Sequence, residues 1–571
     1  MPWEARLIKA KLLACLSFGV LILAVAVPVS SAQVDAARLK TLNARLQQQL
    51  KTYNRFPASL RMAMDGASNA AHAAVAFKNM LPALAKPMSR PALAAKMQAQ
   101  MAAAASTSGV STVSDSSTDL DLSGFAGFTQ SETSTAWCGN SVVVGFNDSG
   151  SFLQTTVSGM GGLSFSGAAV STNRGATFKD VGAMPPGANF DNFLEGDPQV
   201  ACTSPSNFYY AQLFATSDAA TNPISTVGFS TSTDGGASWS DPIPVVYKNG
   251  FSHQIDKEWL SVDPSNPKRM YISYTDFDYT FSDPACPNDA RTAIEVVSSG
   301  NGGVTWGAPT VIDTVCGFSD ALQGSHIVVG SDGKVNLAWV HFTNFPIGAR
   351  ELRFTSYARG KKPKGHTVVD GIVGGGDTFY LQGSFRDFLG LDMTIDRSGG
   401  PTDGTIYVTW DDGRDKSIPD IFGISGAYGF DDVLLRFSTD KGATWGFAPI
   451  KVNSDLQPRV GYGHDHYQPG IAVDATGKVG ACWYDRRNDA SNFGIERFCG
   501  TSADGITWTN SKVAVPSFGP EHGIDGAINP VYMGDYDGLA SDSLKTNPGF
   551  IGAFEVMTAK ANPDVKAFTF K

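Results

Sequence analysis

The sequence predicts an all-β fold made of repeated four-stranded sheets, and three observations carry this prediction. After residue 119 the chain alternates short apolar runs with Gly, Pro, Asn and Asp, and no helix-length period appears. One turn motif recurs five times, and one pair of strands can be recognised seven times. The composition agrees, because 61 Gly and 35 Phe with only 17% charged residues are typical of many tight turns between strands.

The repeated turn has one residue pattern in all of its copies. An Asn or Asp side chain is expected to accept backbone N–H bonds, a Gly takes the positive φ that the turn requires, and a Trp or Phe ends the motif. The copies are STNRGATF from Ser171, STDGGASW from Ser232, SGNGGVTW from Ser299, STDKGATW from Ser438 and SADGITW from Ser502. We therefore predict a structural role for these residues.

These turns resemble Asp boxes, also called BNR repeats, which mark the sialidase-like β-propellers. The resemblance covers residues 130 to 571. It implies that the boxes lie on outer hairpins, away from the active face. It implies an architecture rather than one activity, because propellers of this kind serve as hydrolases, receptors and assembly scaffolds.

The number of blades follows from the strands that lie innermost in each repeat. Their starts are SETSTAWC at Ser131, GDPQVAC at Gly196, KEWLSVD at Lys257, GSHIVVG at Gly324, LGLDMTID at Leu389, YQPGIAVD at Tyr467 and GDYDGLAS at Gly534. Residues 119–571 are thus predicted to form a seven-bladed Asp-box propeller, with the six-bladed form of sialidases as the alternative. The last blade lacks an outer strand, which we expect from residues 119–128, so that the ring closes.

The chain before the propeller shows three patterns. Residues 1–32 combine basic residues, an apolar run and small residues at the expected cleavage site, which is typical of a secretory signal peptide. An uncleaved membrane anchor is the alternative. Residues 33–105 are predicted as a helical Ala-rich extension and residues 106–118 as a Ser/Thr-rich linker. We interpret the extension as loosely attached, with a propeptide or docking arm as the alternative.

Cleavage would leave six cysteines, an even number in an exported chain, so disulfides are expected. Cys482 and Cys499 lie on neighbouring predicted strands and are the best single pair. The expected location is secreted or periplasmic, without stable membrane insertion after cleavage.

Polar side chains are expected to meet at one end of the central channel. In an up-and-down blade, the starts of the first strands and the loops between second and third strands share one face. The candidates for catalysis on that face are Asp485, Arg486, Arg414, Asp411, Glu258, Tyr467 and Tyr536.

The resemblance implies a sialidase-like exo-glycosidase that hydrolyses terminal sugars of glycans. In such an enzyme a Tyr polarised by a Glu attacks the anomeric carbon, an Asp is the acid/base, and arginines hold the substrate carboxylate. The Arg-Ile-Pro motif of sialidases is absent from the opening blade, and an acid-rich mouth repels an anionic sugar. The candidate arginines are Arg386, Arg414 and Arg486 or Arg487.

Two other interpretations stay open. A different glycan-acting enzyme would use paired carboxylates, such as Asp411 or Asp485 with Glu258, as acid and base or nucleophile. A non-catalytic propeller would bind a glycan, a protein partner or a cation at the same mouth. In the segments WDDGRD and WYDRRND, ion pairs that brace adjacent loops are at least as good an explanation as catalysis.

The partners and cofactors are predicted more broadly. A net charge of −10 without a long basic run argues against nucleic-acid binding, so the expected partner is a glycan or glycoconjugate. No cofactor is predicted, and a structural or channel-bound calcium is left open. His464, Asp465 and His466 resemble metal ligands. Alternation along a strand would put the two histidines on one side, but no third ligand is identifiable, which favours a surface loop.

Overall fold

The structure, a computed structural model, describes most of the propeller and parts of the chain before it. The described residues are 36–56, 61, 66–84, 104–105, 109–114, 120–122, 125–127, 129–158, 161–344, 349–373, 380–388, 390–414, 429–457, 463–520, 525–557 and 563–571. The predicted signal peptide, residues 1–32, lies outside them. Within the described ranges, no helix is long and apolar enough to cross a membrane.

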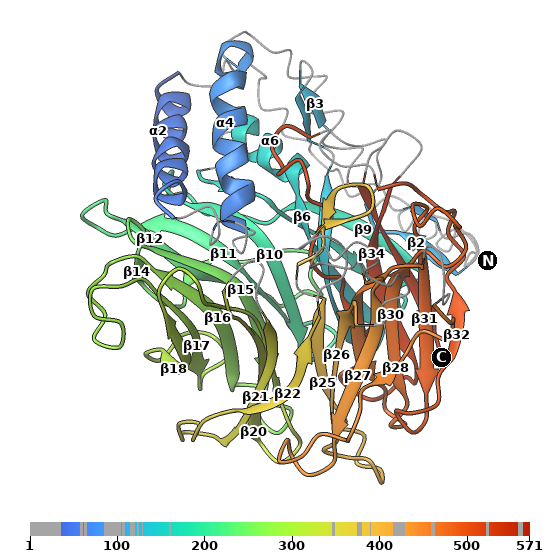
Figure 1. The fold of residues 1–571 in the computed structure, drawn as a ribbon. Coiled ribbons are helices and arrows are strands. Elements are labelled where there is room, and N and C mark those ends of the chain that lie inside the picture. The colour runs from blue at the N-terminus through green and yellow to red at the C-terminus, as the bar shows by residue number, and fades with distance from the viewer. Residues whose placement is uncertain are drawn as a thin grey trace, which may run out of the picture.

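Seven antiparallel sheets stand around one axis, which confirms the predicted seven-bladed propeller over the six-bladed alternative (Figure 1). Blade 1 contains β5 (Gln130–Cys138), β6 (Ser141–Asp148), β8 (Ser166–Ser171) and β9 (Thr177–Ala183), with β1 (Ala104–Ala105) at its edge. Blade 2 contains β10 (Phe193–Cys202), β11 (Phe208–Ser217), β12 (Pro223–Ser232) and β13 (Ile243–Pro244), with β14 (Lys248–Asn249) on β12 and β7 (Leu163–Ser164) on β10. Blade 3 contains β15 (His253–Val262), β16 (Met270–Asp278), β17 (Arg291–Ser299) and β18 (Thr310–Cys316).

The remaining blades continue the same order, from the innermost strand outward. Blade 4 contains β19 (Ala321–Val329), β20 (Lys334–Phe342), β21 (Arg350–Ala358) and β22 (Thr367–Ile372). Blade 5 contains β25 (Leu391–Ile395), β26 (Ile406–Asp412), β27 (Asp432–Ser438) and β28 (Ile450–Lys451). Blade 6 contains β29 (His466–Val473), β30 (Val479–Asp485), β31 (Glu496–Ser502) and β32 (Thr509–Lys512). Blade 7 contains β33 (Leu539–Ser541), β34 (Phe550–Met557), β35 (Pro563–Phe570) and β2 (Val110–Thr112).

The ring closes through β2, which pairs antiparallel with β35, the last strand of the chain. The expectation of an outer strand at residues 119–128 was therefore wrong. That segment holds β3 (Leu120–Leu122) and β4 (Phe125–Gly127), which pair with each other. Strand β2 lies inside the range predicted as a linker, where the β-branched Val110 and Thr112 favour a strand and Val113 is buried in the core.

The helical extension packs on the propeller and is not loosely attached. Helices α2 (Ala36–Tyr53) and α4 (Gly66–Leu84) stand together on one face, next to α6 (Ser149–Ser158) (Figure 1). The apolar stripe of α2 is buried in a cluster shared by all three helices and the first two blades, because an amphipathic helix is stable when its apolar face is covered. The members of this cluster include Leu39, Leu42, Leu46, Phe77, Phe152, Phe165 and Phe193.

The five repeated turns bind their own backbones as the residue pattern predicts. In the second copy, Ser232 Oγ donates to Asp234 Oδ1 at 2.8 Å, and Ser238 N donates to the same oxygen at 2.9 Å. The other copies repeat the bond from Ser Oγ to the Asn or Asp side chain. The turns lie beside the hairpins that end the first strands, as the bond from Gly235 N to Ser206 O at 2.9 Å demonstrates. They thus mark the face opposite to the one where the first strands begin.

A glycine in each repeated turn also joins neighbouring blades. It has a positive φ, and a Cβ there would meet a buried side chain of the preceding blade. The pairs are Gly175 with Ile551, Gly236 with Val143, Gly303 with Phe229, Gly442 with Phe354 and Gly505 with Tyr407.

Three disulfides join described strands and loops. Cys482 pairs with Cys499 across β30 and β31, as predicted from their neighbouring strands. The other two pairs are Cys138 with Cys202, which links blades 1 and 2, and Cys286 with Cys316.

We expect Gly303→Ala to lower the free energy of unfolding by roughly 2–4 kcal/mol, because the residue has a φ of 85° and its methyl group would collide with Phe229. Gly302→Ala is the matched control, since Gly302 has a φ of 77° but no neighbouring atom within 4 Å. It should cost only roughly 1–2 kcal/mol. Urea unfolding of both variants measures the difference, and equal losses would contradict the role of this glycine between blades.

Candidate functional site

Five of the seven innermost strands carry the same β-bulge near their start. In β5, β10, β15, β19 and β29, two residues oppose one residue of the second strand. The first bulge residue has a φ between 49° and 68° in every case, although four of the five are not glycine. The five residues are Glu132, Asp197, Lys257, Gly324 and Gln468. A non-glycine residue in this left-handed region costs roughly 1–2 kcal/mol, so other contacts must stabilise it.

Ion pairs between blades provide that stabilisation. Lys257 Nζ lies 2.9 Å from Glu132 Oε1, 3.6 Å from Asp197 Oδ2 and 3.3 Å from Asp535 Oδ2. Arg386 donates to both carboxylate oxygens of Asp535, at 3.2 and 2.7 Å. All five side chains are buried. We call them the hub ion cluster, and they join blades 1, 2, 3 and 7 at the axis.

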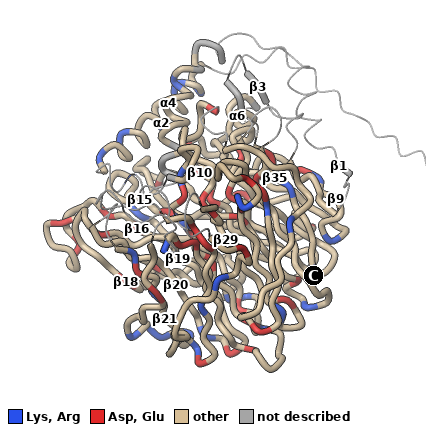
Figure 2. The backbone as a smooth tube through the Cα atoms, turned by 45° about the vertical axis from the view of Figure 1, so that its right-hand side comes forward, with Lys and Arg blue, Asp and Glu red and all other residues tan. Residues whose placement is uncertain are grey.

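Acidic residues gather near the centre of the ring, around β10 and β29 (Figure 2). Four further carboxyl groups lie at the starts or ends of strands on the side of blades 5 and 6. Asp411 is half-buried, while Asp387, Asp431 and Asp465 are buried. We call these four the mouth carboxyls. One oxygen of Asp387 and one of Asp431 have no hydrogen-bond partner among the described residues.

Three of the mouth carboxyls, Asp387, Asp431 and Asp411, hold protons more tightly than ordinary aspartates do. Burial, followed by the charge of Asp411, raises the pKa of Asp387 and of Asp431 well above the usual range. Burial raises the pKa of Asp411 to about 6, against a bond from the Gln468 backbone and the charge of Arg350, which lower it. Protonated and ionised carboxyl groups thus coexist within one site near neutral pH.

The bulge in β29 positions Asp411. With its φ of 49°, Gln468 directs its N–H to Asp411 Oδ2 at 3.0 Å, and its side chain donates to Gly534 O at 2.6 Å. The carboxyl group of Asp411 also packs against Gly390, where a Cβ would collide with it. Asp411 is therefore fixed in place from two neighbouring segments.

Asp485 and Arg414, two of the predicted catalytic residues, form braces instead of lining the mouth. Asp485 is fully buried and accepts bonds from Trp483 Nε1 at 2.7 Å and from the guanidinium of Arg487. In the same way, Asp412 accepts bonds from Trp410 Nε1 and from Arg414. The W-x-D-x-R pattern common to WDDGRD and WYDRRND thus forms one local structure twice, as the bracing interpretation predicts.

Arg486 and Tyr467 are also buried in packing contacts. The guanidinium of Arg486 donates to the carbonyls of Gln382 and Asn492, both at 2.8 Å, and lies 5.6 Å from the centre of the Tyr467 ring. Arg486 thereby attaches the hairpin of β23 (Tyr380–Leu381) and β24 (Phe385–Arg386) to blade 6. Tyr467 is 1% exposed, and burial raises its pKa further, which makes it a poor nucleophile.

Glu258 and Tyr536 lie beside the hub ion cluster. Both line a cavity of about 20 Å³ that also touches Lys257 and His326 and has room for one water molecule. Lys257 Nζ lies 5.0 Å from the centre of the Tyr536 ring. Burial raises the pKa of Glu258 well above its usual range.

His466 has no access to solvent, so the surface loop expected for it was wrong. Its Nε2 lies 3.1 Å from Asp455 and 3.6 Å from Asp485, which makes it part of the brace in blade 6. Over the described ranges, no group of three or more His, Cys, Asp or Glu side chains is placed to hold a metal ion.

The sequence reasoning missed Asp387, Asp431 and the bulges, and it singled out Asp465 only as a possible metal ligand. Asp387 and Asp431 stand just before strands β25 and β27, and Asp465 precedes β29, so an acid before a strand start was the available signal. Most of the bulges have no such signal, because Glu, Lys and Gln do not favour a positive φ.

No protein-family model matches the chain, and no curated protein matches its sequence. Among solved structures, a Hadza microbial sialidase is 11% identical, with a TM-score of 0.37. The match covers 65% of each chain, so this chain spans just under two thirds of the length of that sialidase. An α-L-arabinanase of Penicillium chrysogenum is 10% identical over 62% of this chain and 88% of its own, with a TM-score of 0.38. A PL25 ulvan lyase is 10% identical over 79% of this chain and 95% of its own, with a TM-score of 0.44.

Replacing the buried carboxylate of one brace should destabilise the fold. We expect Asp485→Asn to lower the free energy of unfolding by about 3 kcal/mol, because Arg487 loses its buried partner. Asp332→Asn is the control: its pair with Lys441 is solvent-exposed, and its loss should cost less than about 1 kcal/mol. Urea unfolding compares the two, and an Asp485→Asn variant as stable as the wild type would refute the brace.

The buried acids should make the protein less stable as the pH rises. Burial and then the charge of Asp256 raise the pKa of Glu195, which accepts a bond from Gln49 of α2, to about 8. Because its folded pKa exceeds its unfolded value, its contribution is complete below the unfolded pKa and is lost as the pH rises to about 8. Glu195→Gln should therefore flatten the fall of the melting temperature between about pH 5 and pH 8.

Asp440 provides the control for that titration. The side-chain bond from Thr444 lowers its pKa to about 2, so Asp440→Asn should leave the slope between about pH 5 and pH 8 unchanged. Parallel curves for Glu195→Gln and the wild type would show that Glu195 is ionised in the folded protein.

Proposed function

We propose that this propeller acts on carbohydrate and hydrolyses glycosidic bonds of uncharged sugars at its acidic mouth. The observation that carries the proposal is Asp411, a half-buried carboxyl group whose pKa is raised to about 6 beside two buried acids that hold their protons more tightly. Glycoside hydrolysis needs one carboxyl group in each protonation state, and environments that separate two pKa values supply both.

The roles follow from these protonation states. Above about pH 6, Asp411 is ionised and serves as the base or nucleophile. Asp387 or Asp431 stays protonated and gives its proton to the leaving oxygen. Gln468 and Gly390 hold Asp411 in place for either role.

The arginines argue for an uncharged sugar. A sialidase-like exo-glycosidase requires arginines directed at the substrate carboxylate. All four candidate arginines lie within 3.4 Å of a protein carboxylate, and the ionised Asp411 repels an anionic sugar. The four pairs are Arg386 with Asp535, Arg414 with Asp412, Arg486 with Asp465 and Arg487 with Asp485.

We also assign the five turns to the Asp-box class and the chain to the exported proteins. The bond from Ser Oγ to the Asn or Asp side chain, repeated in all five turns, supports the first assignment. Three disulfides support the second, because disulfides persist in oxidising compartments.

A panel of fluorogenic glycosides, with uncharged sugars and a sialoside, tests the function. We expect the full chain to release an uncharged sugar at a rate that rises with pH through about 6, as Asp411 ionises. Asp411→Asn should lower kcat by at least about 100-fold without changing the melting temperature. The exposed Asp332→Asn should keep full activity.

Other results would count against the proposal. Unchanged turnover in Asp411→Asn would remove Asp411 from the chemistry, and release from the sialoside alone would restore the sialidase interpretation. Glycan binding without any released sugar would favour the alternative, a non-catalytic propeller that uses the same mouth for recognition.

A further inference from the structure

A cavity of about 600 Å³ runs along the axis on the other side of the hub ion cluster. Its wall starts one or two residues after Glu132, Asp197, Lys257, Gln468 and Asp535, and it ends at the first-strand hairpins beside the repeated turns. At that end Pro264, Leu544 and Lys545 are exposed. The cavity therefore opens on the face opposite to the acidic mouth. We call it the axial channel.

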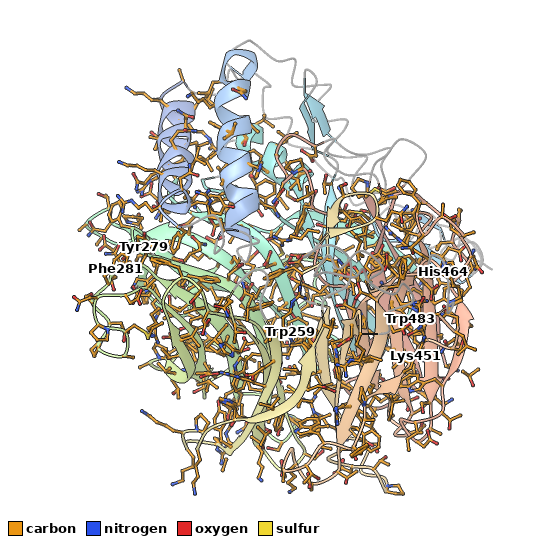
Figure 3. All side chains as sticks on the ribbon, viewed as in Figure 1. Trp259, Tyr279, Phe281, Lys451, His464 and Trp483 are labelled. Atoms are coloured by element: carbon orange, nitrogen blue, oxygen red, sulfur yellow. A yellow bond between two sulfur atoms is a disulfide. The ribbon has the colours of Figure 1, made fainter. Side chains whose placement is uncertain are left out.

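Aromatic and polar side chains meet at the inner end of the axial channel. Trp259, which lies near the centre of the ring, makes an edge-to-face contact with Tyr536 at 5.9 Å between ring centres (Figure 3). Its ring centre is 3.8 Å from that of His326. Trp259 and Tyr536 line both the channel and the small cavity at His326, so the two spaces adjoin.

Two polar groups at this end retain bonding capacity. His326 is 5% exposed and its Nδ1 bonds to Gly324 O at 3.1 Å, while its Nε2 has no hydrogen-bond partner among the described residues. Burial lowers the pKa of His326 to about 3, so the ring is neutral and Nε2 is an acceptor. Asp392 Oδ1 lies 3.8 Å from this Nε2, and burial raises the pKa of Asp392 to about 7.

The charges around the channel disfavour an anion. Lys257 Nζ lies over Tyr536 at the inner end, but Glu132, Asp197 and Asp535 offset its charge. Asp392 and the other acids of the wall, Asp263 and Asp474 among them, outnumber its two basic residues and repel an anion. A ligand that carries hydroxyl groups and one apolar face, without a negative charge, meets both the acceptors and the aromatic wall without this repulsion.

We propose that the axial channel is a second ligand site, separate from the mouth, that binds an uncharged sugar or polyol. Trp259 and Tyr536 form its aromatic wall, and His326 Nε2 and the Asp392 carboxyl group bond the ligand's hydroxyl groups. Thr394, half-buried two residues after Asp392 along β25, lies in the wall where the ligand passes.

Calorimetric titration of the full chain with uncharged monosaccharides and inositol tests this site, with glucuronate and glucosamine as charged comparisons. Thr394→Tyr fills the channel and should weaken binding by at least about tenfold. Asp392→Asn removes a hydroxyl acceptor without adding volume, and it should weaken binding in the same direction. Asp332→Asn, at an exposed residue outside the channel wall, is the matched control and should bind within about twofold of the wild type.

Several outcomes would overturn the channel site. These are wild-type affinity in a folded Thr394→Tyr, preference for a charged ligand, no binding of any uncharged ligand, or loss of binding in Asp332→Asn alone. If Thr394→Tyr does not fold, Asp392→Asn decides the question. Channel binding without glycoside hydrolysis would sustain this site and refute only the proposed activity, so the two failures are distinguishable.

Discussion

The ammonium group of Lys257 is the contact on which the axial end of this propeller depends. It is shared by carboxylates from blades 1, 2 and 7, and two of these belong to bulge residues with a positive φ, as Lys257 itself does. Each left-handed residue costs roughly 1–2 kcal/mol, and leaving one charge of a buried ion pair without its partner costs roughly 3–5 kcal/mol. Relaxing a bulge would leave such a charge unpaired, which costs more than the left-handed conformation, and the bulges in turn direct charged side chains to the axis.

The hub ion cluster also divides the axis into two compartments. On the side of the helices lie the mouth carboxyls, where burial and mutual repulsion keep protons on Asp387 and Asp431. On the side of the repeated turns lies the axial channel, where Trp259 and Asp392 face a wider space. One set of strands can thus present two sites of different chemistry, because each strand runs from one face to the other.

The recurring turn motif and inner strands made the seven-bladed fold predictable, and the local residue pattern was sufficient to locate most of its strands. Turn motifs and inner strands recur at nearly constant spacing, and Cys482 and Cys499 lie opposite each other once adjacent strands are placed. The closing strand could not be found in this way. Val110–Thr112 is short and surrounded by Ser and Gly, and its pairing with β35 joins the two ends of the domain.

The candidate site was predictable only in outline. The carboxyl groups do gather at the expected end, but Asp411 and Asp412 are adjacent in sequence and point to opposite sides of β26. One is half-buried at the mouth, whereas the other is bonded to Trp410 and Arg414. The W-x-D-x-R pattern contains the same residue types for a brace as for catalysis. Burial and bonding partners, which depend on distant loops, decide between the two.

The central claim is that the mouth holds carboxylic acids that remain protonated at neutral pH. Infrared spectroscopy measures this directly, through the C=O stretch of protonated carboxyl groups in the wild type and in Asp387→Asn and Asp431→Asn. We expect a band that persists at about pH 7 in the wild type and loses intensity in each variant. A band of unchanged intensity in both variants would contradict the claim, because other buried acids such as Glu195 and Glu258 also contribute to the wild-type band.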